Sequence, residues 1–325
     1  MAIISNNKVR ITILDGGATN PGDISWGKIS ELGLTQIFDY TSNDLVVQRS
    51  QDADVLLIGR TPLVKDILAQ LYNLKLICTL GTGFNMIDLE YCNKHGITVC
   101  NAPNYSTISV AQHIFALLLS ISNSVKEFNA EVRAGAWSGQ AQLDFLKYSP
   151  FELCGKTLGI IGFGNIGSQI TKIAQAFGMR CIATSKSIQS GESYGVQFGD
   201  LEYVLKNADI ISLNCPLDEQ TRGLINKKTI ALMKKGVIII NTSRGEVIDE
   251  TALAYALDNG YIKAAALDVL SNEPNVQHSP LLSSKNCIIT PHIAWASYES
   301  RVRLIEIVAE NIKAFLNGKV QNKVV

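Results

Sequence analysis

Apolar residues in this chain occur in two alternating arrangements. Short continuous runs rich in Val, Ile and Leu are typical of strands that are buried on both faces of a parallel sheet. The stretches between these runs place apolar residues three or four positions apart, which is the spacing of an amphipathic helix. In the first hundred residues the pattern predicts strands at 9–14, 54–58, 74–78 and 97–100, and helices near 26–32, 63–71 and 87–94.

The alternation resumes after residue 156 and predicts a second unit. Its expected strands are 157–161, 180–183, 210–213, 237–240, 264–267 and 287–290, with helices near 201–207, 227–233 and 250–259. We expect a final helix at 297–317 to return to the first unit. The chain is therefore predicted to be α/β, with two Rossmann-like or flavodoxin-like domains, parallel sheets and an active-site cleft between the domains. We place the first domain at 1–104 plus 292–325 and the second at 105–291.

A predicted helix at 106–122 carries an apolar stripe that is broad for a single domain boundary. Three aromatic residues, Trp137, Phe145 and Phe151, follow it. One explanation is packing within the chain. The other is a subunit interface, because a large apolar surface is usually covered by a partner. Both explanations stay open, and we expect a homodimer.

Composition limits the classes of partner. The chain has 325 residues, with 29 basic and 29 acidic side chains, so charge gives no reason to expect nucleic acid or a membrane as a partner. Residues 1–10 lack the apolar core of a signal peptide, and every apolar run is too short to span a bilayer. The seven cysteines are scattered and include no C-x-x-C pair. We therefore expect free thiols, no metal site and a cytoplasmic protein.

The stretch 158–167, Leu-Gly-Ile-Ile-Gly-Phe-Gly-Asn-Ile-Gly, joins a predicted strand to a predicted helix. In a G-x-G-x-x-G motif of this kind, Gly162 permits a tight turn and Gly164 lets the backbone approach a pyrophosphate. Gly167 lets the helix pack closely on the strand, and the N–H groups at the helix start favour an anion. The motif predicts dinucleotide binding, and a glycine-rich turn with a purely structural role is the alternative.

Four further blocks follow the glycine motif. They are Leu-Asn-Cys-Pro-Leu at 213–217, Asn-Thr-Ser-Arg-Gly-Glu-Val-Ile-Asp at 241–249, Leu-Asp-Val-Leu-Ser-Asn-Glu-Pro at 267–274 and Thr-Pro-His-Ile at 290–293. Together the blocks resemble the D-isomer-specific 2-hydroxyacid dehydrogenases over nearly the whole chain. Segments 20–26 and 291–297 resemble the glycerate dehydrogenases, also called hydroxypyruvate reductases. The resemblance implies an NAD(P)-dependent oxidoreductase acting on the CH–OH group, with a substrate-binding first domain and an NAD(P)-binding second domain.

Reduction of a 2-keto acid needs a hydride, a proton for the carbonyl oxygen and a cation for the carboxylate. His292 is the candidate proton donor, because an imidazole titrates near neutral pH and this residue follows a predicted strand within a family block. Arg244 is the candidate cation, since its planar fork can grip a carboxylate and polarise the neighbouring carbonyl. For each residue a structural role is the alternative, as a satisfied histidine or as an arginine that caps a strand end.

The resemblance assigns further residues to the substrate side. Glu273 corresponds to the partner of the catalytic histidine, where a carboxylate favours the protonated ring and fixes its orientation. A surface glutamate in a turn is the alternative. Formate dehydrogenases share this fold but lack the acid, so Glu273 favours proton-coupled hydride transfer. The backbone N–H groups of Thr82 and Gly83 correspond to a second carboxylate contact, and Trp295 is expected near the substrate side chain.

The resemblance also assigns residues to the cofactor. Asn165 and Ile166 offer backbone N–H groups to the pyrophosphate. The nicotinamide-side positions correspond to Cys215, Pro216, Thr242 and Asp268. For Cys215, a packed thiol is favoured over a nucleophile, since no basic neighbour is evident in the sequence. Asp268 has the alternative role of capping the turn that follows it.

One departure from the family concerns the adenosine end of the cofactor. Enzymes that use NAD place an acid at the end of the second strand, where it binds the ribose hydroxyls. Here that strand ends in Ser185 and Lys186, with no acid. A carboxylate would repel a 2′-phosphate, whereas a serine and a lysine can accept one. We therefore expect NAD(P)H as cofactor, with NADP(H) mildly favoured.

The resulting hypothesis is a D-2-hydroxyacid dehydrogenase of the hydroxypyruvate reductase, glyoxylate reductase or glycerate dehydrogenase type. Two alternatives stay open. One is a dinucleotide-sensing protein on the same scaffold, as in corepressors that resemble these enzymes. The other is a dehydrogenase with the same chemistry that acts on a bulkier 2-keto acid.

Overall fold

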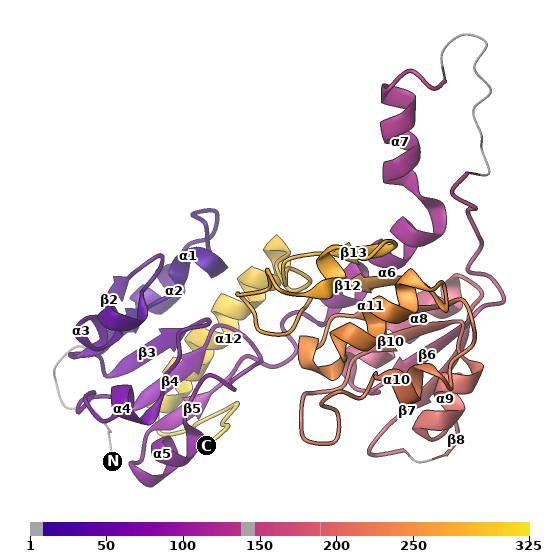
Figure 1. The fold of residues 1–325 in the computed structure, drawn as a ribbon. Helices are drawn as coiled ribbons and strands as arrows, with labels where there is room; N and C mark the ends of the chain where they lie inside the picture. Colours follow the sequence, from indigo (N-terminus) through magenta and orange to yellow (C-terminus); the bar gives the residue numbers. More distant parts are fainter. Residues whose placement is uncertain (1–8, 138–146, 189) are drawn as a thin grey trace. The chain divides into compact units, whose positions relative to one another are not determined.

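The structure is a computed structural model that describes residues 9–137, 147–188 and 190–325 (Figure 1). The chain divides into two compact units, residues 1–106 with 296–325 and residues 107–295. Phe145, one of the aromatic residues considered for a subunit interface, lies outside the described residues.

The first unit is built on a five-stranded parallel sheet with the strand order β2-β1-β3-β4-β5. Strands β3 and β4 are buried along their whole length, as the continuous apolar runs predict. The strands are β1 (Arg10–Ile13), β2 (Leu34–Ile37), β3 (Val55–Ile58), β4 (Leu76–Thr79) and β5 (Thr98–Cys100). The helices before residue 107 are α1 (Gly16–Thr19), α2 (Gly27–Ser30), α3 (Val46–Ser50), α4 (Lys65–Leu68) and α5 (Leu89–Lys94).

The last helix, α12 (Tyr298–Leu316), belongs to this first unit, where it contacts α2 and β4. Ser297 caps its start by accepting a hydrogen bond from the amide of Ser300. Arg301, nearly buried, donates two hydrogen bonds to the Asp23 carboxylate, each 2.6 Å long. The hydrogen bond from Arg301 lowers the pKa of Asp23 below its usual value. This pair ties α12 to the segment that follows α1.

The second unit carries an eight-stranded sheet with the order β13-β12-β11-β10-β6-β7-β9-β8. All of its strand pairs are parallel except β8 with β9. Its strands are β6 (Thr157–Ile161), β7 (Arg180–Thr184), β8 (Gly191–Ser193), β9 (Val196–Phe198), β10 (Ile210–Leu213), β11 (Val237–Asn241), β12 (Ile262–Leu267) and β13 (Cys287–Ile289). Its helices are α6 (Thr107–Asn123), α7 (Val125–Arg133), α8 (Asn165–Ala176), α9 (Leu201–Asn207), α10 (Lys227–Ile230) and α11 (Glu250–Asp258).

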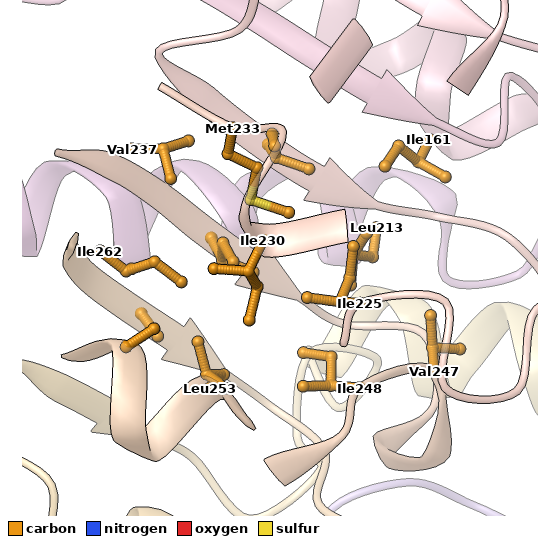
Figure 2. Close-up of a cluster of buried hydrophobic side chains, with 14 of the residues drawn as sticks. Ile161, Leu213, Ile225, Ile230, Met233, Val237, Val247, Ile248, Leu253 and Ile262 are labelled. Atoms are coloured by element: carbon orange, nitrogen blue, oxygen red, sulfur yellow. The ribbon is translucent and has the colours of Figure 1, made fainter. Parts of the chain in front are cut away.

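Alternate residues of the central strands serve two separate cores in this unit. Ile238 and Ile240 of β11 pack with α6 and α8, whereas Val237 and Ile239 pack with α9, α10 and α11. Figure 2 shows part of the second core, where Leu253 of α11 lies among Ile, Val and Leu side chains of the sheet and its loops. The sheet is therefore covered on both faces, which confirms the α/β class and the parallel sheets predicted from the sequence.

The apolar stripe of α6 packs within this unit, because Ile114, Leu117 and Leu118 are buried in the core shared with α8. Helix α7 differs, since none of its residues is buried. In the described part of the chain, no single helix has the length and apolar character needed to span a membrane. Only α6 and α7 taken together reach both, and they are bent by 55° where they meet.

The sequence pattern did not predict three of the strands, and each has an edge position or an exposed face. Strand β2 lies at the edge of its sheet and has largely exposed side chains. Strand β8 lies at one edge of the second sheet, paired antiparallel with β9, and its side chains are largely exposed. The third, β9, lies next to β8 and has an exposed central residue, Gln197. A strand with solvent on one side needs no continuous apolar run, so the signal that located the inner strands is absent there.

Truncation of the α11 side chain that faces the core should cost much of the stability of the second unit. Leu253 is fully buried, so Leu253→Ala is expected to lower the free energy of unfolding by about 2–5 kcal/mol. Tyr255 lies on the same helix and is 71% exposed, so Tyr255→Ala should change it by less than about 0.5 kcal/mol. Urea denaturation followed by circular dichroism measures both. Equal losses in the two variants would contradict the assigned core face of α11.

Candidate active site

The glycine turn after β6 has the geometry that its sequence predicts. Gly162 has a φ of +94°, and a Cβ at this position would lie 2.6 Å from the backbone nitrogen of Cys215. A Cβ at Gly167 would lie 2.9 Å from the carbonyl oxygen of Gly162. No larger residue fits either position, so both glycines are required by the packing of the turn itself.

Gly164 is different, because a Cβ there would meet no protein atom within 4 Å. It is the residue before α8, and the first-turn amides of this helix, including those of Asn165 and Ile166, follow it directly. Of the three glycines in the motif, only Gly164 could carry a side chain without touching the protein. The open space beside it lies at the N-terminus of α8. This arrangement fits a bound dinucleotide, with the pyrophosphate against the helix start.

The other predicted cofactor residues gather at the same edge of the sheet. Each follows the carboxyl end of a strand: Ser185 and Lys186 follow β7, Cys215 and Pro216 follow β10, Thr242 follows β11 and Asp268 follows β12. These strands are parallel, and together with β6 they are neighbours in the sheet. Their carboxyl ends therefore form one continuous rim, the location at which open α/β sheets bind ligands.

Cys215 is buried, and this burial raises the pKa of its thiol above the usual value. The thiol is therefore protonated at neutral pH and is a poor nucleophile. This agrees with the interpretation of Cys215 as a packed wall residue. The amide of the preceding residue, Asn214, donates to Ile161 and fixes the loop beside the glycine turn.

The loop after β10 also supplies an acid that the sequence did not indicate. Asp218 accepts a 2.8 Å hydrogen bond from the Lys186 ammonium. This hydrogen bond is the main reason that the pKa of Asp218 falls to about 2. The two residues are far apart in the sequence and come from different strand ends, so only the folded structure reveals the pair.

Asp268 is 1% exposed and its carboxylate organises the turn that carries His292. Its oxygens accept hydrogen bonds from the Thr290 hydroxyl (2.6 Å) and from the amides of Ile293 (2.9 Å) and Ala294 (2.8 Å). Its backbone carbonyl accepts the amide of His292 at 2.7 Å. Asp268 thus holds the turn at 290–294 rather than the turn that directly follows it, and its contact with cofactor stays a prediction.

Burial raises the pKa of Asp268, but the hydrogen bonds from His113, Thr290 and the two amides outweigh it and lower the pKa overall. His113 reaches this network from α6, with its Nε2 3.0 Å from the Thr290 hydroxyl. His113 lies within the predicted helix at 106–122, and its partner Thr290 is 177 residues away in the chain, so no local signal could have identified the contact.

His292 and Glu273 form the closest acid–imidazole contact of the site. His292 Nδ1 lies 2.7 Å from Glu273 Oε2, and Glu273 Oε1 accepts the amide of Leu270 at 3.0 Å. His292 has a φ of +56°, an unusual value for a non-glycine residue, and Asp268 and the Trp295 indole N–H both bond the turn around it. With Nδ1 engaged by the carboxylate, Nε2 is the ring nitrogen that remains for a substrate.

Arg244 follows β11 and lies in a turn that packs against the Glu273 loop. Asn241 donates to the Arg244 carbonyl at 2.8 Å, and Arg244 Nη1 donates to the Ser243 carbonyl at 2.7 Å. A Cβ at Gly245 would lie only 2.0 Å from the backbone carbon of Leu270. The two backbones are therefore in direct contact, which brings the Arg244 turn next to the loop that holds Glu273.

Thr82 and Gly83 belong to the first unit, in the loop after β4. The Thr82 hydroxyl donates to the Ala102 carbonyl at 2.9 Å, and the Asn101 side chain donates to the Thr82 carbonyl at 2.8 Å. Among the described residues, none accepts a hydrogen bond from the backbone N–H of Thr82 or Gly83. The loop is thus fixed while two adjacent amides are left for an anion.

The remaining histidines have structural surroundings. His95 stacks on the Tyr91 ring at 3.9 Å between centroids and bonds the Tyr91 carbonyl at the end of α5. His278 lines a cavity of about 490 Å³ with Glu250 and Ser279. Over the described ranges, no three His, Cys, Asp or Glu side chains are grouped so that they could hold a metal ion.

Comparison with known proteins agrees with this geometry. Residues 115–294 match the model of the D-isomer specific 2-hydroxyacid dehydrogenase NAD binding domain. A hydroxypyruvate reductase of Blautia hydrogenotrophica is 42% identical over 97% of this chain and 99% of its own length. The chain belongs to the D-isomer-specific 2-hydroxyacid dehydrogenases. It is therefore an NAD(P)-dependent oxidoreductase that acts on the CH–OH group of 2-hydroxy acids.

Other relatives and solved structures are similar over most of the chain. A glycerate dehydrogenase of Methylorubrum extorquens is 37% identical, covering 86% of this chain and 88% of its own. The D-lactate dehydrogenase of Aquifex aeolicus, complexed with NAD and lactic acid, matches with a TM-score of 0.82 and 31% identity over 95% of this chain and 96% of its own. An acyclic imino acid reductase in complex with NADPH and D-Arg matches with a TM-score of 0.86 and 31% identity over 98% of this chain and all of that one. These comparisons confirm the predicted family and enzyme class, and they do not favour the corepressor alternative.

Gly164→Ala should separate folding from cofactor binding. Because nothing in the protein lies within 4 Å of the added methyl group, the urea midpoint should stay that of the wild type. The methyl group would enter the space assigned to the pyrophosphate, so NAD(P)H should bind about tenfold or more weakly. Fluorescence titration with NADH and NADPH measures the affinity. Wild-type affinity in this variant would place the pyrophosphate elsewhere.

Asp268 should stabilise the fold in a pH-dependent way. Its pKa is lower in the folded protein than the usual 3.8, so its contribution is complete above that value and is lost as the pH falls through the folded pKa. Asp268→Asn should therefore cost about 1–3 kcal/mol near pH 7, and the gap to wild type should shrink below about pH 4. Urea unfolding between pH 3 and pH 7 measures the gap, with Asp258→Asn, at the exposed end of α11, as control. A gap that stays constant down to pH 3 would contradict the role given to the ionised carboxylate.

Proposed function

We propose that this enzyme reduces hydroxypyruvate to D-glycerate, or glyoxylate to glycolate, and can also run in the direction of a glycerate dehydrogenase. The observation that carries the proposal is the 2.7 Å contact between His292 and Glu273, held beside the Arg244 turn. The names of the relatives support the substrate class. They include the hydroxypyruvate reductase and glycerate dehydrogenase described above and a glyoxylate reductase of Thermococcus litoralis that is 39% identical over 85% of this chain.

In the proposed reaction each side chain has one task. The Arg244 guanidinium binds the substrate carboxylate in a bidentate manner and polarises the adjacent carbonyl. His292 holds a proton on Nε2 and gives it to the carbonyl oxygen, while Glu273 at Nδ1 keeps the ring oriented. The amides of Thr82 and Gly83 provide a second contact to the carboxylate, and Trp295 lies near the substrate side chain. Bound nicotinamide supplies the hydride.

For the cofactor, the proposal is that both dinucleotides are used and that NADP(H) is mildly favoured. Ser185 and Lys186 stand where NAD-specific enzymes place an acid, and a hydroxyl and an ammonium can both bond a 2′-phosphate. The Ser185 hydroxyl already bonds Ser187 at 3.0 Å, and Lys186 bonds Asp218. A phosphate must compete with these contacts, so the preference is expected to be small.

The proposal also includes a cytoplasmic homodimer. Val125, Val132 and Trp137, on and just after α7, are 66%, 39% and 70% exposed, which is the apolar surface that a second subunit would cover. The cytoplasmic assignment rests on the cysteines, since all seven are free thiols and Cys154 is exposed.

Replacement of His292 should remove the proton donor and leave the rest of the site intact. His292→Ala is expected to lower kcat by about 10²- to 10⁴-fold with a much smaller change in KM. Glu273→Gln should give a smaller loss, because the ring is still present but is held by a neutral amide in place of the carboxylate. Steady-state kinetics with hydroxypyruvate measures both, with His95→Ala as a matched histidine control. Near wild-type turnover in His292→Ala would refute its role.

The substrate class is tested by NAD(P)H oxidation with a panel of 2-keto acids, each run with both cofactors. We expect the highest kcat/KM with hydroxypyruvate or glyoxylate, and a higher value with NADPH than with NADH by a factor of about 2–5, which is the size of an exposed ionic contact. A maximum at a branched or aromatic keto acid would favour the bulkier-substrate alternative. Oxidation with no member of the panel would contradict the proposal as a whole.

A further inference from the structure

The turn assigned to the adenosine ribose is met by an acid from a different strand end. Lys186 lies in the turn after β7, and its ammonium is 2.8 Å from Asp218 Oδ2 in the loop after β10. We propose that Asp218 is a specificity-determining residue, which limits the preference for NADP(H) by holding the Lys186 ammonium and by placing a carboxylate beside the 2′-phosphate position. This inference rests on the proposed placement of the cofactor.

The position of Asp218 follows from three loops that meet beside β6. The amide of Gly162 donates to the carbonyl of Thr184, which joins the glycine turn to the end of β7. The amide of Asn214 donates to Ile161, and a Cβ at Gly162 would touch the backbone of this same loop. Asp218, in the loop after β10, therefore lies near both the glycine turn and the ribose turn. The ribose turn itself contains no acidic residue.

The two oxygens of the Asp218 carboxylate have separate tasks. Oδ1 accepts the amides of Gln220 (3.0 Å) and Thr221 (2.9 Å), which fixes the loop. Thr221 also donates to the Pro216 carbonyl at 2.7 Å and so braces the same turn. Oδ2 receives the ammonium of Lys186. The acid is thus anchored by its own loop, whereas the lysine, whose side chain is 71% exposed, is the partner that can move.

The contact between Asp218 and Lys186 is expected to affect the binding of NADPH and of NADH differently. A 2′-phosphate attracts the Lys186 ammonium, but it must draw that ammonium away from Asp218 and then lie near a carboxylate that remains ionised, since its pKa is about 2. A ribose that carries only hydroxyl groups meets no such repulsion and can donate to the carboxylate. Asp218 is therefore expected to weaken NADPH binding and to leave NADH binding unchanged or improved.

Asp218→Asn tests this without disturbing the loop, because an amide oxygen can still accept the two amides at Oδ1 while the charge at Oδ2 is lost. The dissociation constant for NADPH should fall by about three- to tenfold, and that for NADH should stay the same or rise, as expected for removing one charge at an exposed ionic site. Fluorescence titration of each reduced cofactor at low and at physiological salt measures both constants, and the gain should be larger at low salt.

Asp258→Asn is the matched control, since it makes the same change in net charge at the end of α11, which leads into β12, a strand that does not neighbour β6 or β7. It should leave the ratio of the two constants at the wild-type value. A ratio in Asp218→Asn within twofold of wild type, or a shift equal to that of the control, would overturn the proposal. Equal urea midpoints for wild type and both variants would show that the comparison is between folded proteins.

A second pair of variants tests the part assigned to Lys186. Lys186→Met should weaken NADPH binding more than NADH binding, and the gain from Asp218→Asn should shrink in that background because no ammonium is left to release. An undiminished gain would contradict the holding role of Asp218. The proposed cofactor preference is judged separately from the wild-type ratio alone, and failure of the wild type to bind either dinucleotide would refute the proposed function instead.

Discussion

The site depends on one buried carboxylate. Asp268 follows β12, and its oxygens hold the turn at 290–294 through a hydroxyl and two amides, while its carbonyl holds the amide of His292. This network keeps His292 at a positive φ, a conformation that a free chain rarely adopts. Glu273 then meets the imidazole at a single nitrogen. The orientation of the proton donor is thus a consequence of ordinary hydrogen bonds made at the end of a buried strand.

The order of the parallel strands brings the other residues of the site to the same edge of the sheet as Asp268. Strands β10, β6 and β7 bring together the loops that surround the glycine turn, and β11, β12 and β13 bring together Arg244, Asp268 and His292. Close backbone approaches at Gly162, Gly167 and Gly245 leave no room for a side chain, so these positions fix the loops relative to one another. Of these four glycines, only Gly164 has open space where a Cβ would lie, as expected for a glycine that makes room for a ligand rather than for the protein itself.

Much of the fold could be predicted because inner parallel strands, such as β3, β6 and β11, are buried along their whole length and are therefore mostly apolar. Edge strand β2 was not predicted, because a strand whose side chains face solvent does not need a continuous apolar run. In the site, His292 and Arg244 could be proposed from the chemistry of a keto acid, and Glu273 from a family resemblance. The partners of Lys186 and Thr290 could not be foreseen, since Asp218 and His113 are 32 and 177 residues distant and nothing local marks them. The predicted cleft between the domains stays a prediction.

In the proposed reaction, the His292 imidazole, fixed through Asp268 and Glu273, faces the carbonyl of a bound keto acid. A crystal structure of the enzyme with NADP⁺ and oxamate, an unreactive analogue of such an acid, measures this directly. We expect His292 Nε2 at about 2.6–3.2 Å from the oxamate carbonyl oxygen, with Arg244 on the carboxylate. An imidazole turned away from the analogue, or a carboxylate bound without Arg244, would contradict it.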